Sequence, residues 1–153
     1  MLILLLALAG GPTTAQAGAP LPRFAALRAD EVNLRAGPGK KYPVEWVFLR
    51  RALPIEIIAE YGQWRKIRDF DGSEGWVHKN LLTRRRSVLV TGAVRTLRHG
   101  PTLDAEPLAR AEPGVIGRLL ACEDGWCEIE TAGHQGWLPI TDLWGVYDGE
   151  VVE

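Results

Sequence analysis

Polar and apolar residues alternate between Trp64 and Leu82 in the pattern of a β-hairpin that ends in a half-turn. Positions 64, 66 and 68 alternate with 65, 67 and 69, which predicts a strand with one buried and one solvated face. The sequence Asp-Gly-Ser at 71–73 is typical of a tight turn, because glycine accepts a positive φ and aspartate can bond its own backbone. A second strand is predicted over residues 75–78.

A diverged copy of this hairpin follows at residues 126–143. Three landmarks recur in the same order, at offsets that fall only from 63 to 61 residues. They are Leu-Arg-x-Gly-Pro at 34 and 97, tryptophan at 64 and 126, and Gly-Trp at 75 and 136. Such spacing indicates an internal repeat, and we expect two domains, near residues 28–83 and 88–145, joined by a short linker.

The rest of each copy also predicts strands and turns. In the first copy the expected strands are 29–35, 44–49 and 54–61, with a rigid loop over 36–43 and a loose arm over 18–27. No segment has helical periodicity over the length of a helix. The fold class is therefore all-β, with two small five-stranded barrels or sandwiches in tandem.

The chain opens on a short apolar run, residues 2–10, followed by Ala15-Gln16-Ala17. This pattern is typical of a signal peptide cleaved after Ala17, although no basic residue precedes the run. A buried N-terminal helix is the alternative. The run is too short to span a membrane, which takes about 20 residues. We expect an exported protein, periplasmic or secreted, that does not span the membrane.

The two cysteines, Cys122 and Cys127, flank a predicted turn at 123–125. Export implies an oxidising compartment, in which such a pair is bridged, and a hairpin brings the two Cβ atoms within bonding range. The alternative is a thiol nucleophile activated by His134. A disulfide is the better interpretation, because nothing in the sequence indicates an activated thiol.

Charge is divided between the halves. Residues 18–86 carry 14 basic and 8 acidic side chains, a net of +6, and residues 87–153 carry 4 and 11, a net of −7. Either the halves dock on each other, or the basic half meets an anionic polymer such as peptidoglycan or lipid headgroups. The basic run at 84–86 is either a solvated linker or part of such a contact. Export argues against a nucleic-acid partner.

The repeat resembles the bacterial SH3-like (SH3b) family over nearly all of the mature chain. The motifs that carry the resemblance are Val-Asn-Leu-Arg-x-Gly-Pro at 32–38, Gly-x-Trp-x-Lys-Ile at 62–67, Gly-x-x-Gly-Trp-Val at 72–77 and Leu82. The second copy keeps shorter forms of them, with Thr96 where the family has asparagine. The resemblance implies that Ile67, Val77, Leu82, Ile129, Leu138 and Leu143 face the two cores.

The resemblance also implies a binding groove walled by flat rings, which suit an extended ligand. The implied groove residues are Tyr42, Trp46, Trp64, His78, Leu81, Trp126 and Pro139. The alternative is that several of these aromatic residues only cover a small core. The 37–42 loop is basic, whereas SH3 domains that bind proline-rich peptides carry acidic residues there.

Catalytic motifs are absent from the sequence: there is no nucleophile elbow, no His-Glu-x-x-His and no pair of histidines at metal-ligand spacing. We therefore expect no catalysis, no metal and no cofactor. The expected function is a non-catalytic envelope module that binds extended peptides or peptidoglycan. The alternatives are an adaptor for another envelope protein, with its two domains packed as one unit, and a cell-wall hydrolase.

Overall fold

The computed structural model describes residues 18–153, so the expected signal peptide at 1–17 lies outside the described part of the chain. The first of its two sheets contains β1 (Arg23–Leu27), β2 (Val32–Arg35), β3 (Val44–Phe48), β4 (Pro54–Tyr61), β5 (Trp64–Arg68), β6 (Glu74–His78) and β7 (Leu82–Thr83). A single 3-10 turn, η1 (Lys79–Leu81), separates β6 from β7.

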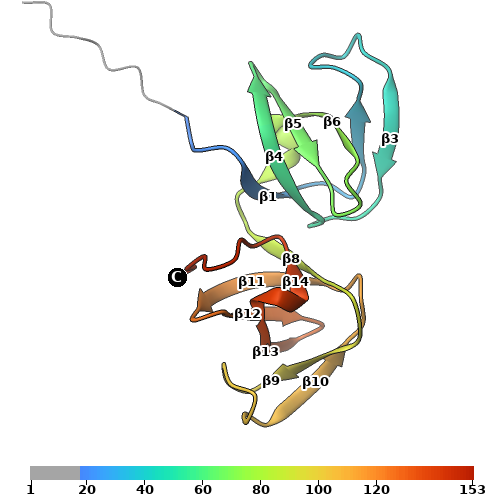
Figure 1. Cartoon of the computed structure of the whole chain (residues 1–153). Coiled ribbons are helices and arrows are strands. Elements are labelled where there is room, and N and C mark those ends of the chain that lie inside the picture. The colour runs from blue at the N-terminus through green and yellow to red at the C-terminus, as the bar shows by residue number, and fades with distance from the viewer. Residues whose placement is uncertain (1–17) are drawn as a thin grey trace, which may run out of the picture.

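The second sheet repeats this arrangement. It contains β8 (Ser87–Val90), β9 (Arg95–Arg98), β10 (Pro107–Ala111), β11 (Ile116–Glu123), β12 (Trp126–Thr131), β13 (His134–Pro139) and β14 (Leu143–Trp144), with η2 (Ile140–Asp142) before the last strand. The strand orders, β3-β2-β6-β5-β4-β1-β7 and β10-β9-β13-β12-β11-β8-β14, place equivalent strands in equivalent positions (Figure 1). The all-β class and the tandem organisation are confirmed.

Each sheet has seven strands instead of the expected five. The added strands are β1 and β7 in the first sheet and β8 and β14 in the second, and β1 pairs with both β4 and β7. The expectation of a loose arm over 18–27 is wrong for β1, because four of its five residues are buried. The arm lacks a period of two because both faces of β1 are covered, and strands buried on both faces do not alternate.

Two separate hydrophobic cores fill the two domains. The first includes Ile55, Ile67 and Val77, and the second includes Ile129, Leu138 and Leu143. Of the six residues that the resemblance assigned to the cores, five are fully or nearly fully buried, while Leu82 is partly buried and packs against the first core. The resemblance therefore assigned the inward-facing residues of the hairpins correctly.

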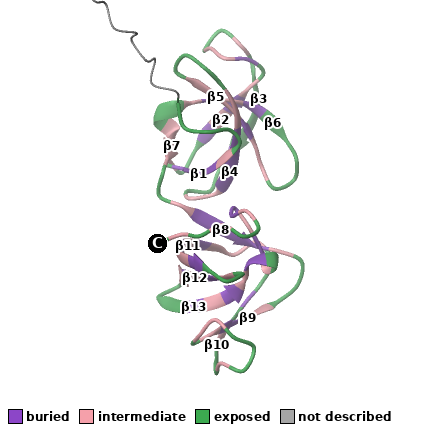
Figure 2. Cartoon of the chain, turned by 60° about the vertical axis from the view of Figure 1, so that its left-hand side comes forward, coloured by how far each residue is buried: buried purple, intermediate pink, exposed green. Residues whose placement is uncertain are grey.

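A third buried region joins the domains. Phe24 and Ala26 of β1, and Pro54 and Glu56 of β4, are buried although they belong to neither core. The Phe24 ring lies 5.0 Å from Trp144 and 4.5 Å from Tyr147. All four residues of β8 are buried, and Figure 2 shows this strand on the side of the second domain that faces the first. The two domains are thus docked.

Hydrogen bonds and apolar contacts make this junction, and opposite charges do not. The Ser87 hydroxyl donates to the carbonyl of Ala52, and the Tyr147 hydroxyl donates to the Glu56 carboxylate at 2.8 Å. Within residues 18–153, no ion pair joins a strand of the first sheet to a strand of the second. The opposite net charges of the two halves are therefore not neutralised by ion pairs between the sheets.

The predicted disulfide is confirmed. Cys122 of β11 and Cys127 of β12 are bridged and lie opposite each other in the strand register. Neither thiol is free, which excludes a nucleophile paired with His134 in this form of the protein. In the described part of the chain, no helix has the length and apolar character needed to cross a membrane.

Candidate functional sites

Trp64 and His78 form a pair at one end of the first sheet. Trp64 begins β5 and His78 ends β6, and the two are register partners with ring centroids 5.4 Å apart in an edge-on arrangement. Both side chains are half-buried. The Nδ1 atom of His78 accepts a hydrogen bond from the backbone N–H of Asn80 at 3.2 Å, which caps η1. An imidazole that accepts at Nδ1 carries its proton on Nε2, so Nε2 is a hydrogen-bond donor at this pair.

The second domain places Trp126 and Pro139 in the same way. Trp126 begins β12, Pro139 ends β13, and these two half-buried residues are again register partners. A tryptophan at the same place in each domain offers flat contact area at low entropic cost. All four residues are among the expected groove residues, and we call these two register pairs the tryptophan pairs.

The other expected groove residues lie in different surroundings. Leu81 is partly buried and packs against the first core. Tyr42 covers Gly37 within its own loop, where an added Cβ would lie 2.5 Å from the tyrosine ring. Trp46, 60% exposed on β3, lines a cavity of about 450 Å³ together with Phe70 and residues of the second domain. Neither Trp64 nor His78 is among the described residues that line this cavity.

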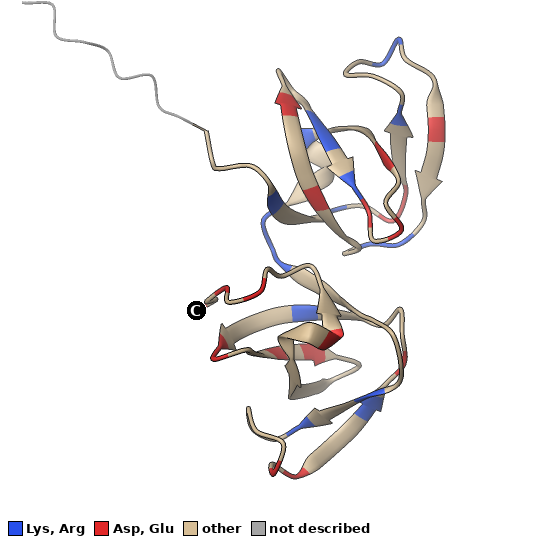
Figure 3. Ribbon diagram, viewed as in Figure 1, with Lys and Arg blue, Asp and Glu red and all other residues tan. Residues whose placement is uncertain are grey.

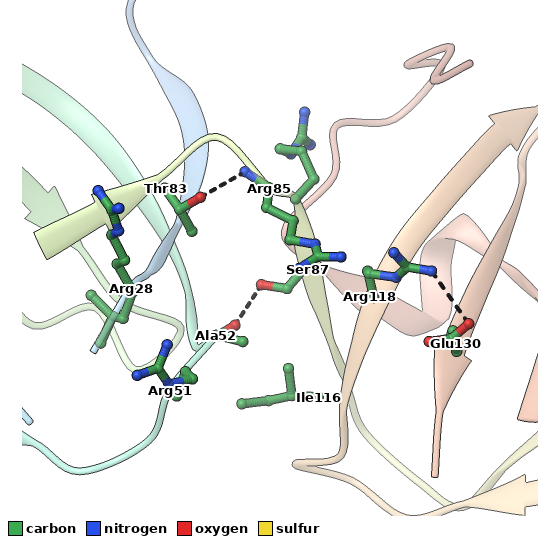
Figure 4. Close-up of a pocket in the computed structure, with 11 residues that line it drawn as sticks. Arg28, Arg51, Ala52, Thr83, Arg85, Ser87, Ile116, Arg118 and Glu130 are labelled. Carbon is green, nitrogen blue, oxygen red and sulfur yellow. Dashed lines mark hydrogen bonds and ion pairs between the residues drawn. The ribbon is translucent and has the colours of Figure 1, made fainter. Parts of the chain in front are cut away.

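A larger cavity, of about 590 Å³, opens at the junction of the domains and is rich in arginine (Figure 4). The arginines that line it are Arg28, Arg51, Arg85, Arg86 and Arg118, and we call this cavity the arginine pocket. Figure 4 shows Arg28 and Arg51 on the side of the first domain, Arg118 on the side of the second, and Arg85 between them. One lining residue, Glu130, is acidic.

Carboxylates hold some of these arginines in place. Arg118 donates to Glu130 at 3.3 Å, and Arg86 donates to Glu150 at 2.7 and 3.2 Å. The hydrogen bond from Gln135, and then the charge of Arg118, lower the pKa of Glu130 below its ordinary value. Burial opposes ionisation of Glu150, but hydrogen bonds from Arg86 and the backbone of Tyr147 leave its pKa lowered. Both carboxylates therefore stay charged at neutral pH.

The sequence did not predict the arginine pocket. The run at 84–86 was recognised as basic, but Arg28, Arg51 and Arg118 are far apart in the chain and meet only because the domains dock. Basic residues outnumber acidic ones in residues 18–86 and the reverse holds in residues 87–153; Figure 3 marks where both kinds lie along the ribbon. The only sequence signal was this charge division.

The described residues offer no grouping suited to metal chemistry. Among residues 18–153, no three His, Cys, Asp or Glu side chains lie close enough together to hold a metal ion. Two of the three histidines are exposed, His99 in a bend after β9 and His134 at the start of β13, and the third caps η1.

Comparison with known proteins finds relatives that are longer than this chain. A protein of Bacillus subtilis (strain 168) with the name "Putative N-acetylmuramoyl-L-alanine amidase YrvJ" is 26% identical over 125 residues. The alignment covers 74% of this chain and 24% of that protein, so the chain spans about a quarter of its relative.

Solved structures with some likeness come from Trichomonas vaginalis. NlpC2 is 12% identical with a TM-score of 0.38, over 83% of this chain and 49% of its own. NlpC1 is 13% identical with a TM-score of 0.37, over 92% of this chain and 50% of its own.

The family model of the bacterial SH3 domain matches this chain twice, at residues 28–83 and 93–145. The two matches fall on the two sheets, and together they cover most of the chain. The chain therefore belongs to the bacterial SH3 domain family and carries two copies of the domain in tandem.

Proposed function

We propose that this protein is a non-catalytic binding module of the bacterial cell envelope, whose SH3-like domains recognise extended peptides, most directly those of peptidoglycan. The observation that carries the proposal is the tryptophan pair, present at the same place in both domains. A half-buried indole beside His78 or Pro139 provides a flat apolar surface and, at His78, a hydrogen-bond donor.

The similarity to a protein named as an amidase supports a cell-wall context, but the chain matches only about a quarter of that protein. We assign the binding role, and not the reaction, to the shared region. The proposal also includes export through residues 1–17 to the periplasm or the exterior. The disulfide is consistent with this, since such bonds persist in oxidising compartments.

Retention on purified peptidoglycan sacculi tests the binding proposal. We expect the protein to sediment with sacculi, and Trp64→Ala combined with Trp126→Ala to reduce the bound fraction by about tenfold, as loss of buried aromatic contacts does. Leu49→Ala is the control, because Leu49 is an exposed apolar residue outside the tryptophan pairs. The proposal fails if the wild-type protein is not retained, or if the double variant is retained equally well while folded.

A second candidate function is an adaptor that binds another envelope protein. The docked domains favour it, because a buried junction presents both domains as one surface. Recovery of one protein partner from envelope extract, without retention on sacculi, would support the adaptor over the first proposal. Cleared zones in a zymogram of cell-wall material would instead support the third alternative, a hydrolase.

A further inference from the structure

Within residues 18–153, two arginines of the pocket form no ion pair, although the charge of one of them, Arg85, helps to lower the pKa of Glu130. Arg28 and Arg85 are exposed, and among the described residues neither side chain forms an ion pair or a hydrogen bond. Residues 1–17 contain no aspartate or glutamate in sequence that could supply a carboxylate. The ion pair of Arg51 with Asp30 is largely solvent-exposed and therefore weak. Positive charge in the pocket thus exceeds what the protein itself neutralises.

Two further arginines have donors that lack an acceptor. The Nε atoms of Arg86 and Arg118 are buried and make no hydrogen bond, although their terminal nitrogens are held by Glu150 and Glu130. Buried donors in folded proteins normally have partners, and an unsatisfied one is destabilising. Because these two Nε atoms are themselves buried, the donors that a ligand in the pocket can reach are the guanidinium groups of exposed Arg28 and Arg85.

We propose that the arginine pocket binds the oxyanion of a ligand, a carboxylate or a phosphate group, at a site separate from the tryptophan pairs. Guanidinium groups suit this chemistry because their planar fork donates two parallel hydrogen bonds to such groups. A volume of about 590 Å³ accommodates a small anion or the charged end of a larger molecule. Because both domains line the pocket, ligand binding also stabilises the docked arrangement.

The test uses the whole chain with two probes, inorganic phosphate and citrate, at constant ionic strength set with sodium chloride. Backbone amide chemical shifts and titration calorimetry report binding. We expect saturable shifts at residues 83–87 and 116–118 for at least one probe. Arg28→Ala with Arg85→Ala should weaken binding by roughly tenfold or more, because each removes charge-assisted hydrogen bonds. The affinity of the Arg28→Lys, Arg85→Lys variant should lie between those of wild type and the alanine variant, because lysine keeps the positive charge but lacks the planar pair of donors.

The matched control is Lys40→Ala with Arg110→Ala, which removes the same charge from exposed positions outside the pocket. Binding by the control should stay within about twofold of wild type if the effect is local. Response to phosphate alone, to citrate alone or to both identifies the group that the site prefers. The proposal is overturned if neither probe saturates, if the shifts lie elsewhere, or if the control loses as much affinity as the pocket variant.

This proposal and the peptidoglycan proposal fail independently. The anion experiment uses no cell-wall material, and Trp64→Ala should bind phosphate or citrate as the wild type does. Conversely, loss of retention on sacculi in the tryptophan variants says nothing about the arginines.

Discussion

The two domains share one topology, but the two strands of the equivalent hairpins, β4–β5 and β11–β12, are linked by different interactions. Cys122 and Cys127 are register partners on β11 and β12, followed by Glu123 opposite Trp126. At the corresponding place in the first domain, Glu60 lies opposite Arg65, followed by Tyr61 opposite Trp64. Glu60 and Arg65 form an ion pair at 3.3 Å. A covalent link in one domain is thus replaced by an ion pair in the other.

The domains also differ in how much of the hairpin's outer face is covered. In β4, residues Pro54 to Ile57 are all buried, because the second domain packs against the outward-facing side chains. In β11, buried and half-buried residues alternate, and the outward-facing Arg118 borders the arginine pocket. Docking therefore uses one face of the first domain's hairpin and leaves the equivalent face of the second available. The repeat in sequence does not produce two equivalent surfaces.

The largest expected effect comes from removing the ring that joins the domains. Phe24→Ala should lower the free energy of unfolding by about 3 kcal/mol, the cost of deleting a buried phenylalanine. Phe24 belongs to neither core, and its ring contacts Trp144 and Tyr147 of the second domain. We expect urea unfolding to change from one transition to two, followed by the amide signals of the two cores.

The control for this change is Tyr61→Ala, since Tyr61 is an aromatic residue that is 67% exposed. It should alter stability by less than about 0.5 kcal/mol. A single unchanged transition in Phe24→Ala would mean that the domains are not coupled through this junction, and the contrast between the faces of β4 and β11 would lose its significance.

What could be predicted from the sequence differs between the inward and the outward faces of the strands. The resemblance to the SH3b family identified the inward residues of both hairpins, Ile67 and Val77 among them, while alternation predicted that each strand has one buried and one solvated face. Glu56 lies on the outward face of β4 and is nevertheless buried. The second domain covers that face, and Arg68 and Tyr147 satisfy the carboxylate. Docking depends on residues distant in sequence, so neither β1 nor the arginine pocket was predicted.

An intermediate effect is expected from opening the disulfide. The bridge closes a loop with a sequence separation of 5, so its loss should cost about 2 kcal/mol through the entropy of the unfolded chain. Reduced and oxidised protein can be compared by urea unfolding. In the Phe24→Ala variant, we expect reduction to lower the stability of the second domain only. Amide exchange should then become faster at Ile129 and stay unchanged at Ile67.

The matched change in the first domain is Glu60→Gln, which breaks the ion pair with Arg65 at the equivalent position and also the ion pair of Glu60 with Arg23. Its expected cost is below about 1 kcal/mol, because both pairs are partly solvated. Equal losses of unfolding free energy from the two changes would show that the disulfide and the ion pair stabilise their hairpins equally, which would contradict this prediction.

A smaller loss than from Phe24→Ala or from opening the disulfide, and one that depends on pH, is expected from Tyr147→Phe. The Tyr147 hydroxyl donates to buried Glu56, so the variant should lose about 1.5 kcal/mol of unfolding free energy at neutral pH, as for a hydrogen bond to a charged group.

Burial, and then the hydrogen bond to Glu56, raise the pKa of Tyr147 above its ordinary value of 10.0. Above that pH the unfolded chain releases the phenol proton while the folded chain retains it, so stability falls as pH rises. Urea midpoints measured from pH 8 to 11 should decline more steeply for wild type and for Tyr61→Phe than for Tyr147→Phe. Parallel declines in all three proteins would show that the phenol does not join the domains, and that the covered face of β4 is held by apolar contacts alone.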